Sequence, residues 1–372
     1  MTEPRAVHLK KTKRSRMKHW FDEAFYRRTA TQLAALDARF SATRFLDNAL
    51  AGLEDRELLS RLNRTAEAFH IALPVSFPEQ LSVLQAHAPQ IGHNFTAIWP
   101  CAHVAAHGLD QPELSLTALK ELTPYGSAEF ALRPFLQSDP DGTLAVLAGW
   151  AASPNQHVRR LASEGSRPRL PWGIRLHSLV KDPSPTLPIL RLLRADPSLY
   201  VRKSVANHLN DISKDHPEVV LDVAASWDLT CGHTAWIVRH ALRTLVKRGH
   251  PRALELLGAG VAPQLDATFT ATPRRVPIGA TVTFGATLTS NARRSQSLVI
   301  DYVVHYVRSA GKSFPKVFKW KRLDLAQGET VTLLKRQTFR DFSTRRHLAG
   351  LHRVELQING RRLAETAFTL SA

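Results

Sequence analysis

The chain has 372 residues, a formal net charge of +18 and 44% hydrophobic residues, which is enough length and apolar content for two globular domains with full cores. Cys101 and Cys231 are its only cysteines, which argues against a disulfide framework and fits a reducing cytoplasm. No apolar run reaches the length of a membrane span, and the basic N-terminus lacks the apolar stretch of a secretory signal.

The charge is distributed unevenly along the chain. Residues 1–19 are strongly basic, residues 20–149 are net acidic, and residues 150–372 are basic again. Such polarity favours a polyanion held by one part of the molecule, although a basic protein without such a ligand is the alternative. Residues 1–19 are expected to form a flexible basic arm that touches phosphate or a partner, or else a plain disordered tail.

Residues 20–260 are expected to be helical. Apolar residues recur at spacings of three and four, as in Leu33, Leu36 and Phe40. Prolines punctuate the segments, as in Asp139-Pro140 and His250-Pro251, and each predicts a helix that starts near the proline. Short helices with tight turns, repeated along the chain, predict an all-α, HEAT-like helical solenoid.

Three Val-Arg segments recur within this region, and their valines, Val158, Val201 and Val238, are 43 and 37 residues apart. This is the period of HEAT-type helical pairs. The valine is expected to pack, and the arginine after it to lie on a face that packing does not use, where it can bind a phosphate backbone. The cations predicted to contact DNA are Arg159, Arg160, Arg167, Arg169, Arg202, Lys203, Lys214, Arg239, Arg274, Arg275, Arg293 and Arg294.

Two acids follow the first two of these segments. Glu164 lies six residues after Val158, and Asp211 lies ten residues after Val201. Because six and ten differ by one helical turn, both carboxylates are predicted to project from the same side of equivalent helices. An acid beside phosphate-binding cations repels the ligand unless it has a function. The alternative is that both acids form surface ion pairs with nearby arginines.

Two further residues join the candidate site. Pro168 and Pro171 break the helix after Glu164 and are expected to deliver Trp172 from a rigid loop, where its ring face suits an electron-poor, cationic ring. Core packing is the alternative for Trp172. Glu129 stands at a predicted helix start, where it can also stabilise the helix dipole.

The pattern changes to strands after Gly260, and residues 261–372 are expected to form a second domain. About seven segments alternate or are rich in β-branched and aromatic residues, and Asn359-Gly360 is a hairpin signal. This number of strands predicts an all-β, immunoglobulin-like sandwich without an inter-sheet disulfide. Paired arginines near its turns are candidate binding groups, as at 274–275 and 293–294.

Four motifs make the assignment more specific. Residues 128–135, 161–172, 201–214 and 236–242 resemble the AlkC branch of the DNA-alkylation-repair glycosylases. The related AlkD branch shares the helical repeats. The C-terminal sandwich resembles the immunoglobulin-like extension found in a subset of AlkC proteins.

The resemblance implies a monofunctional N-glycosylase that removes 3-methyladenine and 3-methylcytosine from duplex DNA for base excision repair, without flipping the base and without a cofactor. It implies that Glu129, Glu164, Trp172 and Asp211 form the site. Such an enzyme is expected to act as a monomer. The rival hypothesis is a non-catalytic HEAT-repeat scaffold that binds nucleic acid or protein, because a basic solenoid alone does not distinguish the two.

The sequence predicts no metal site. Cys101, His103 and His107 have helix-compatible spacing, but their segment is apolar and lacks a fourth ligand, which favours core histidines. The sequence also contains no P-loop and no GxGxxG motif, so a nucleotide cofactor is unsupported.

Overall fold

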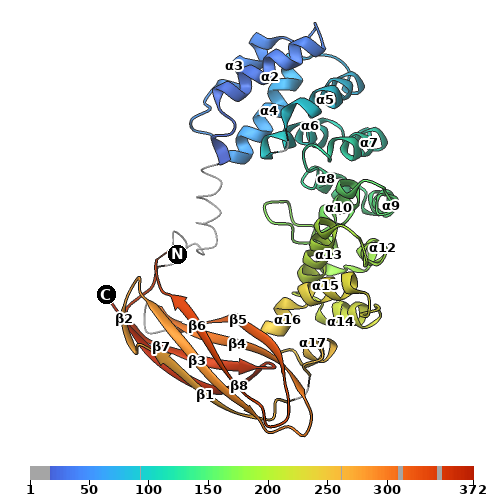
Figure 1. The fold of residues 1–372 in the computed structure, drawn as a ribbon. Helices are drawn as coiled ribbons and strands as arrows, with labels where there is room; N and C mark the ends of the chain where they lie inside the picture. Colours follow the sequence, from blue (N-terminus) through green and yellow to red (C-terminus); the bar gives the residue numbers. More distant parts are fainter. Residues whose placement is uncertain (1–16, 93, 261, 309–312, 342–345) are drawn as a thin grey trace. The chain divides into compact units, whose positions relative to one another are not determined.

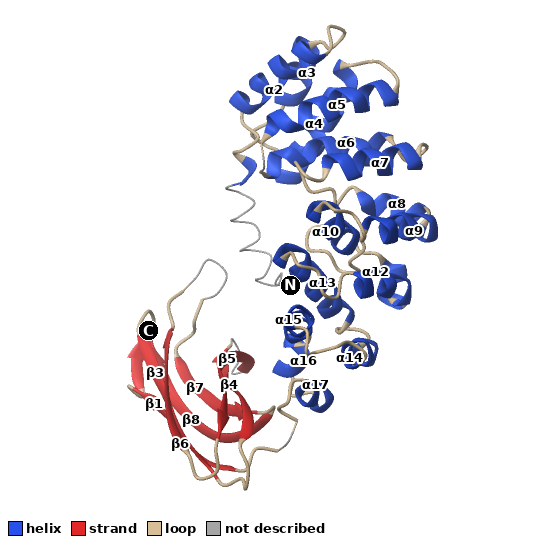
Figure 2. Ribbon diagram, turned by 45° about the vertical axis from the view of Figure 1, so that its right-hand side comes forward, coloured by secondary structure: helices blue, strands red, loops and turns tan. Residues whose placement is uncertain are grey.

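The computed structural model describes residues 17–92, 94–260, 262–308, 313–341 and 346–372. Most of the predicted basic arm lies outside these residues. Helices occupy the described chain up to Leu256, and strands occupy it from Leu265 onward (Figure 2). The predicted order, a helical part followed by an all-β part, is therefore confirmed. The helices are α2 (Glu23–Leu36), α3 (Ala42–Leu50), α4 (Leu58–Ala72), α5 (Phe77–Ile91), η1 (Phe95–Ile98), α6 (Trp99–His107), α7 (Pro112–Leu122), α8 (Leu132–Ser138), α9 (Pro140–Trp150), α10 (Gln156–Gly165), α11 (His177–Lys181), η2 (Ser184–Thr186), α12 (Leu187–Leu192), α13 (Leu199–Ile212), α14 (Pro217–Ala225), α15 (Gly232–Ala241), α16 (Arg243–Lys247) and α17 (Pro251–Leu256).

The three Val-Arg segments lie on α10, α13 and α15. These helices pack in order, α10 on α13 and α13 on α15 (Figure 1). Val158, Val201 and Val238 are all buried, so the recurring valine is a packing residue as predicted. The repeat thereby brings the C-terminal halves of α10 and α13, which carry the candidate acids, next to each other.

The arginine after the valine does not lie on an unused face in the first two segments. Arg159 donates to the carbonyl oxygens of Ser153 and Pro154, and Arg202 donates to those of Asp196 and Pro197. In both cases the arginine lies six and five residues after the carbonyls, which belong to the turn that precedes its own helix. The prediction that packing leaves this face free is therefore wrong for Arg159 and Arg202.

Arg239, in the third segment, is exposed. The residues six and five positions before it are His233 and Thr234, so the proline turn of the other two segments is missing. The sequence difference explains why the third arginine projects from the surface.

Several prolines start helices as predicted. Pro140, Pro217 and Pro251 are each the first residue of a helix, and Asp139 caps α9 by accepting a hydrogen bond from the Gly142 amide at 3.0 Å. The Ser153-Pro154 pair instead precedes α10 by one further residue, because Asn155 provides the cap.

The C-terminal part is a two-sheet sandwich. One sheet has the order β1-β3-β6, and the other has the order β2-β8-β7-β4-β5. The seven predicted strands are present, and the additional strand, β2, is three residues long and pairs parallel with β8. Asn359 and Gly360 have φ values of 46° and 75° and form the predicted hairpin turn. The strands are β1 (Leu265–Thr272), β2 (Arg275–Pro277), β3 (Thr281–Ser290), β4 (Gln296–Val307), β5 (Ser313–Leu325), β6 (Thr330–Thr338), β7 (Gly350–Ile358) and β8 (Arg361–Ser371).

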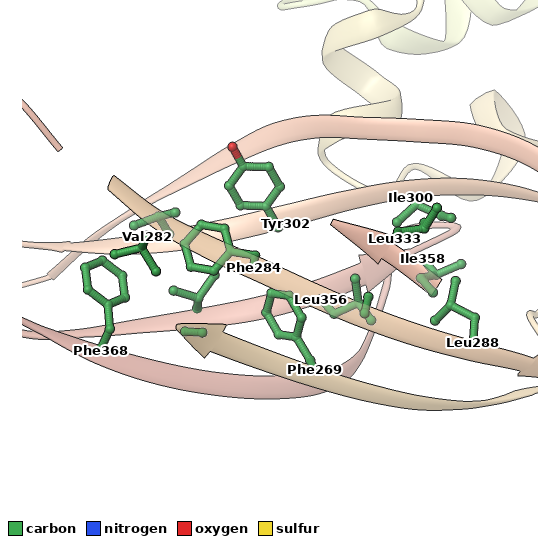
Figure 3. Close-up of a cluster of buried hydrophobic side chains, with 14 of the residues drawn as sticks. Phe269, Val282, Phe284, Leu288, Ile300, Tyr302, Leu333, Leu356, Ile358 and Phe368 are labelled. Carbon is green, nitrogen blue, oxygen red and sulfur yellow. The ribbon is translucent and has the colours of Figure 1, made fainter. Parts of the chain in front are cut away.

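The core of the sandwich lies between the two sheets and is rich in aromatic rings (Figure 3). Inward residues alternate with partly exposed ones along β3, where Val282, Phe284 and Leu288 are buried. The rings of Phe284 and Tyr302 approach to 5.3 Å between centroids across the sheets. An aromatic core thus replaces the inter-sheet disulfide, and both cysteines of the chain are free thiols in the helical part.

The described chain divides into two compact units. One contains residues 17–215 and 227–241, and the other contains residues 216–226 and 242–372. The last described helix ends at Leu256 and β1 begins at Leu265, on either side of residue 260, but α14, α16 and α17 group with the sandwich. Within that unit, Arg322 on β5 donates to the Leu257 carbonyl and Gln357 on β7 donates to the Lys247 carbonyl. Among the described helices, none is both long and apolar enough to cross a bilayer.

Candidate active site

Glu164 and Asp211 are joined by one guanidinium group. Arg167 donates from Nη1 to Glu164 Oε1 at 2.6 Å, and its Nε and Nη2 lie 2.9 and 2.7 Å from Asp211 Oδ2. Lys214, one turn after Asp211, holds the other oxygen, Oδ1, at 2.7 Å. The two predicted acids therefore lie within reach of the same side chain, as the spacing of six and ten residues indicated.

A second arginine links Glu164 to Glu129. Arg160 donates to Glu129 Oε2 at 2.9 Å, lies 3.6 Å from Glu164 Oε1, and donates to the Ser127 hydroxyl. Glu129 occupies the turn that precedes α8 rather than the helix itself. The guanidinium carbon of Arg160 also lies 5.2 Å from the ring centroid of Tyr200. Three acids from three segments thus form one continuous network.

This network is buried, which separates it from the surface ion pairs that the sequence left as an alternative. Glu164 is 7% exposed and Asp211 is 3% exposed. Burial lowers the pKa of Arg167, but the charges of Glu164 and Asp211 outweigh it and hold that pKa above its ordinary value. Buried ion pairs contribute little to stability compared with apolar packing, so an arrangement of this kind points to a function.

Trp172 lies on the loop between α10 and α11, with φ at 71°. A positive φ is costly for a residue with a side chain, so the surrounding structure must hold it. Arg133 does so from α8: it is fully buried and donates to the carbonyls of Gly165, Arg167 and Ile174. The Trp172 ring packs edge-on against Phe95, with centroids 6.1 Å apart.

The turn that carries Glu129 is positioned by a close backbone approach. A Cβ atom at Gly126 would lie 1.8 Å from the Ala97 carbonyl oxygen, so this position requires glycine. The Cys101 thiol donates to the Gly126 carbonyl at 3.2 Å. Cys101 therefore supports the Glu129 turn and is separate from the histidines with which its sequence spacing grouped it.

Four supporting residues were not identified from the sequence. Ser204 donates to Glu164 Oε2 at 2.6 Å, and a buried nitrogen of His208 lies 2.9 Å from the Ser163 carbonyl. Arg133 and Tyr200 complete the set. Ser204 and His208 lie seven and three residues before Asp211 on α13, which is a helical spacing that places all three on one face and was available as a signal. Nothing in the sequence indicated the long-range contacts of Arg133.

The predicted DNA-binding cations fall into three groups. Some form ion pairs: Arg159 with Asp196, Arg169 with Asp215, and Arg160, Arg167 and Lys214 with the site acids. Arg202 is held by carbonyls, as described above. The remaining cations are exposed and form no ion pair with a described residue: Lys203, Arg239, Arg274, Arg275, Arg293 and Arg294. For all of these groups, contact with DNA stays a prediction.

The two carboxylates of Glu164 and Asp211 retain acceptor sites that can take part in chemistry. Each carboxylate oxygen of Glu164 and Asp211 has two acceptor sites, and the cations fill only part of them. The remaining sites can orient a water molecule or face a positive charge on a sugar ring. The loop that carries Arg167 also carries Trp172, whose aromatic ring can provide a surface for a cationic base. Carboxylates of this kind are suited to hydrolysis at an anomeric carbon.

Comparison with known proteins identifies the class. Residues 125–245, which include all four predicted site residues, match the family model of the DNA alkylation repair enzymes, and residues 266–372 match the C-terminal Ig-like domain of the uncharacterised protein YhaZ. The fold and the site therefore define a DNA alkylation repair enzyme with an immunoglobulin-like C-terminal domain.

Two relatives extend over nearly the whole chain. The alkylpurine DNA glycosylase AlkC of Pseudomonas fluorescens, solved bound to DNA containing an abasic site analogue, is 44% identical, with a TM-score of 0.93 over 96% of this chain and 99% of that one. The uncharacterised protein YhaZ of Bacillus subtilis (strain 168) is 42% identical over 86% of this chain and 90% of its own length. The chain belongs to the AlkC family.

Proposed function

We propose that this protein is a monofunctional DNA glycosylase that hydrolyses the N-glycosidic bond of cationic N3-alkylated bases, 3-methyladenine and 3-methylcytosine, in duplex DNA. The observation that carries the proposal is the Arg167 bridge, which holds Glu164 and Asp211 together, buried, beside the loop of Trp172. The AlkC relative, an alkylpurine DNA glycosylase solved with DNA, supports the glycosylase activity of this proposal.

The chemistry follows from the charge of the lesion. An N3-alkylated base is already positive, so it leaves with the electrons of the glycosidic bond as a neutral base and needs little acid catalysis. The sugar left behind carries positive charge at its anomeric carbon. Asp211 and Glu164 stabilise that charge and orient the attacking water, which adds its oxygen to the carbon and gives its proton to a carboxylate or to solvent.

Trp172, Glu129 and Arg167 have supporting roles in this proposal. Trp172 contacts the lesion or its sugar through its ring face. Glu129 adds a third negative charge to the network, because its Oε2 lies 2.9 Å from Nη1 of Arg160, which also approaches Glu164. Arg167 fixes the spacing of the two carboxylates through charge-assisted hydrogen bonds to both.

We further propose that the lesion stays within the duplex during excision and that helical pairs of the HEAT type hold the backbone, while exposed arginine pairs of the sandwich contact phosphate. The enzyme acts as a monomer in a reducing cytoplasm, in keeping with its two free thiols. A 2-aminopurine placed beside the lesion should remain quenched when the protein binds.

A scaffold that binds DNA without catalysis is the rival hypothesis, and the acids discriminate the two. In a scaffold, removing a negative charge near DNA leaves affinity unchanged or improves it, and no base is released. In a glycosylase, alkylated DNA releases free methylated base without metal or cofactor, and the release depends on the acids.

The test compares Asp211→Asn, Glu164→Gln and a matched control, Asp215→Asn. Asp215 lies one turn after Asp211 and is exposed in an ion pair with Arg169 at 2.7 Å. We expect D211N and E164Q to slow single-turnover base release by on the order of 100-fold or more with DNA affinity retained, since comparable electrostatic groups are worth this much. D215N should keep the wild-type rate.

Thermal unfolding of each variant checks that the fold is intact. Equal base release by D211N and D215N would contradict the role of Asp211. An absence of base release by the wild-type protein, together with DNA binding, would favour the scaffold.

A further inference from the structure

Three histidines gather at the contact between α4 and α6, which lie side by side in the helical part (Figure 1). His103 and His107 are four residues apart on α6, and His70 faces them from α4. One ring nitrogen from each of the three lies within 4.8 Å of those of the other two. The cluster involves none of the proposed site residues, and it is independent of the glycosylase proposal.

A fourth candidate ligand lies at the edge of the cluster. Glu67 precedes His70 by three residues on α4, and its Oε2 is 3.6 Å from Nε2 of His107. The side chain of Glu67 is 46% exposed, so the cluster has a route to solvent. Sequence spacing had offered only His103 and His107 with Cys101. The helix pairing replaces the cysteine with a histidine and a carboxylate.

The outer nitrogens of two rings already have acceptors. Nδ1 of His70 lies 3.2 Å from the Gln80 side-chain oxygen, and Nδ1 of His103 lies 3.5 Å from the Ala66 carbonyl. Because each acceptor requires the proton to be on Nδ1, the lone pair is left on Nε2. Metal-binding histidines in proteins are commonly oriented by such a hydrogen bond on the nitrogen that does not bind.

The inner nitrogen of His103, Nε2, is buried and has no hydrogen-bond partner within the described part of the chain. The ring of His103 contacts Phe69 edge-on at 5.1 Å and lies parallel to Phe77 at 6.1 Å, which gives the cluster an apolar wall. An unpaired buried acceptor is costly, and a cation would satisfy it.

We propose that His70, His103, His107 and Glu67 bind a divalent transition metal ion, with zinc as the best match to three imidazoles and one carboxylate. Tetrahedral zinc with bonds of about 2.1 Å needs ligand atoms roughly 3.4 Å apart. The rings therefore rotate inward on binding, and the parallel stack of His70 on His107, now 3.9 Å between centroids, opens. The ion would tie α4 to α6.

The experiment uses the full chain, freed of metal with a chelator and titrated with ZnCl₂ alone. Calorimetry should give one zinc ion per chain, and zinc should raise the midpoint of thermal unfolding. His107→Ala and Glu67→Gln should each weaken binding by about tenfold or more and reduce the shift in the midpoint. Mg²⁺ should not replace zinc, because it prefers oxygen ligands.

His177→Ala is the matched control, since His177 is an exposed histidine at the start of α11. It should bind zinc like the wild type. Glu67 is exposed enough that E67Q folds normally, so a loss of binding in that variant reports on the ligand. Zinc binding that is absent in the wild type, or equally strong in H107A, would overturn the site. Base release in the presence of chelator tests the glycosylase proposal separately.

Discussion

Arg167 is the residue that fixes the geometry between the two carboxylates. Its planar guanidinium reaches Glu164 with one nitrogen and Asp211 with two others. A lysine has the same charge but only one nitrogen, so it cannot span both acids with the same hydrogen bonds. Replacing Arg167 by lysine therefore tests whether base release depends on the position of the two carboxylates or only on the positive charge between them.

Arg167→Lys should reduce single-turnover base release by on the order of 10- to 100-fold, because the acids lose their fixed spacing while the net charge is unchanged. Arg39→Lys is the matched control, since Arg39 pairs with Asp37 and Glu79 at the surface and is not among the predicted DNA-binding cations. Its rate should stay within about twofold of the wild type. A wild-type rate for R167K would show that the charge alone suffices.

The proximity of Glu164 and Asp211 was predictable from the sequence, and the contacts that support the two residues were not. Glu164 and Asp211 follow from a helical spacing that the repeat fixes, because packing of Val158 and Val201 sets the register. Arg133 holds the Trp172 loop from a segment about forty residues away, with a donor reaching the Ile174 carbonyl. Contacts of this kind depend on how helices pack, and no local pattern records them.

At the scale of the helices, the Val-Arg repeat combines packing with a hydrogen bond to the preceding turn. Two of the three arginines bind carbonyls of a proline-containing turn, and Arg159 also pairs with Asp196 at 2.7 Å across to the next repeat. The packing role of the three valines was predicted correctly from the sequence pattern. The role of the arginine could not be read from it, because a side chain that hydrogen-bonds its own turn and one that faces solvent have the same spacing.

Arg159→Ala should destabilise the protein by on the order of 2–4 kcal/mol, because it leaves buried Asp196 without its ion-pair partner. Arg202→Ala should cost roughly 1–2 kcal/mol, since it removes two hydrogen bonds and a cation–π contact with Trp236 but no ion pair. Arg239→Ala should change stability by less than about 0.5 kcal/mol. Urea unfolding of the three variants measures the order of their losses in stability. An equal effect of all three would contradict the structural role of the first two.

At the scale of the strands, β4 carries a buried acid where its register with β5 shifts, between Ile300 and Asp301. Asp301 is 2% exposed, and its Oδ1 has no hydrogen-bond partner in the described part of the chain. Burial raises the pKa of Asp301 to about 6, with Lys319 and Lys247 acting in the opposite direction. The folded protein therefore binds this proton more tightly than the unfolded chain.

The sign of the pH effect follows from this difference. Since the unfolded carboxyl has a pKa near 4, the folded state is stabilised by protonation, and stability falls as the pH rises from about 4 to about 6. Asp301→Asn should remove this fall in stability. The change that the substitution causes in the free energy of unfolding should therefore be more favourable above pH 7 than at pH 4, by on the order of 2 kcal/mol. Thermal unfolding from pH 4 to pH 8 measures it, with exposed Asp324→Asn as control.

At the scale of the whole molecule, the order of a helical part and a sandwich was predictable because the periodicity changes from three and four residues to two. The alternation along β3 and the Asn359-Gly360 turn appear in the structure as the sequence indicates. The grouping of α14, α16 and α17 with the sandwich was not predictable. Helices of five to nine residues carry little information about the surface they pack on.

The net charge of +18 leads to a prediction about DNA affinity. If exposed cations contact phosphates, the logarithm of the affinity falls linearly with the logarithm of salt concentration, with a slope of about −0.9 for each contact. Arg293 and Arg294 are exposed and unpaired with described acids, so R293A/R294A should make the slope shallower by roughly 1–2.

Arg252→Ala is the control for this measurement, because Arg252 is engaged with Glu218 and Asp222 through ion pairs in the same compact unit. Its loss should leave the slope unchanged within about 0.3, since the arginine is already neutralised by acids of its own chain. Binding is measured by fluorescence anisotropy between 50 and 200 mM salt, the range in which counterion release is steep. A slope that R293A/R294A leaves unaltered would remove this arginine pair from the DNA contact surface and confine the phosphate contacts to other cations.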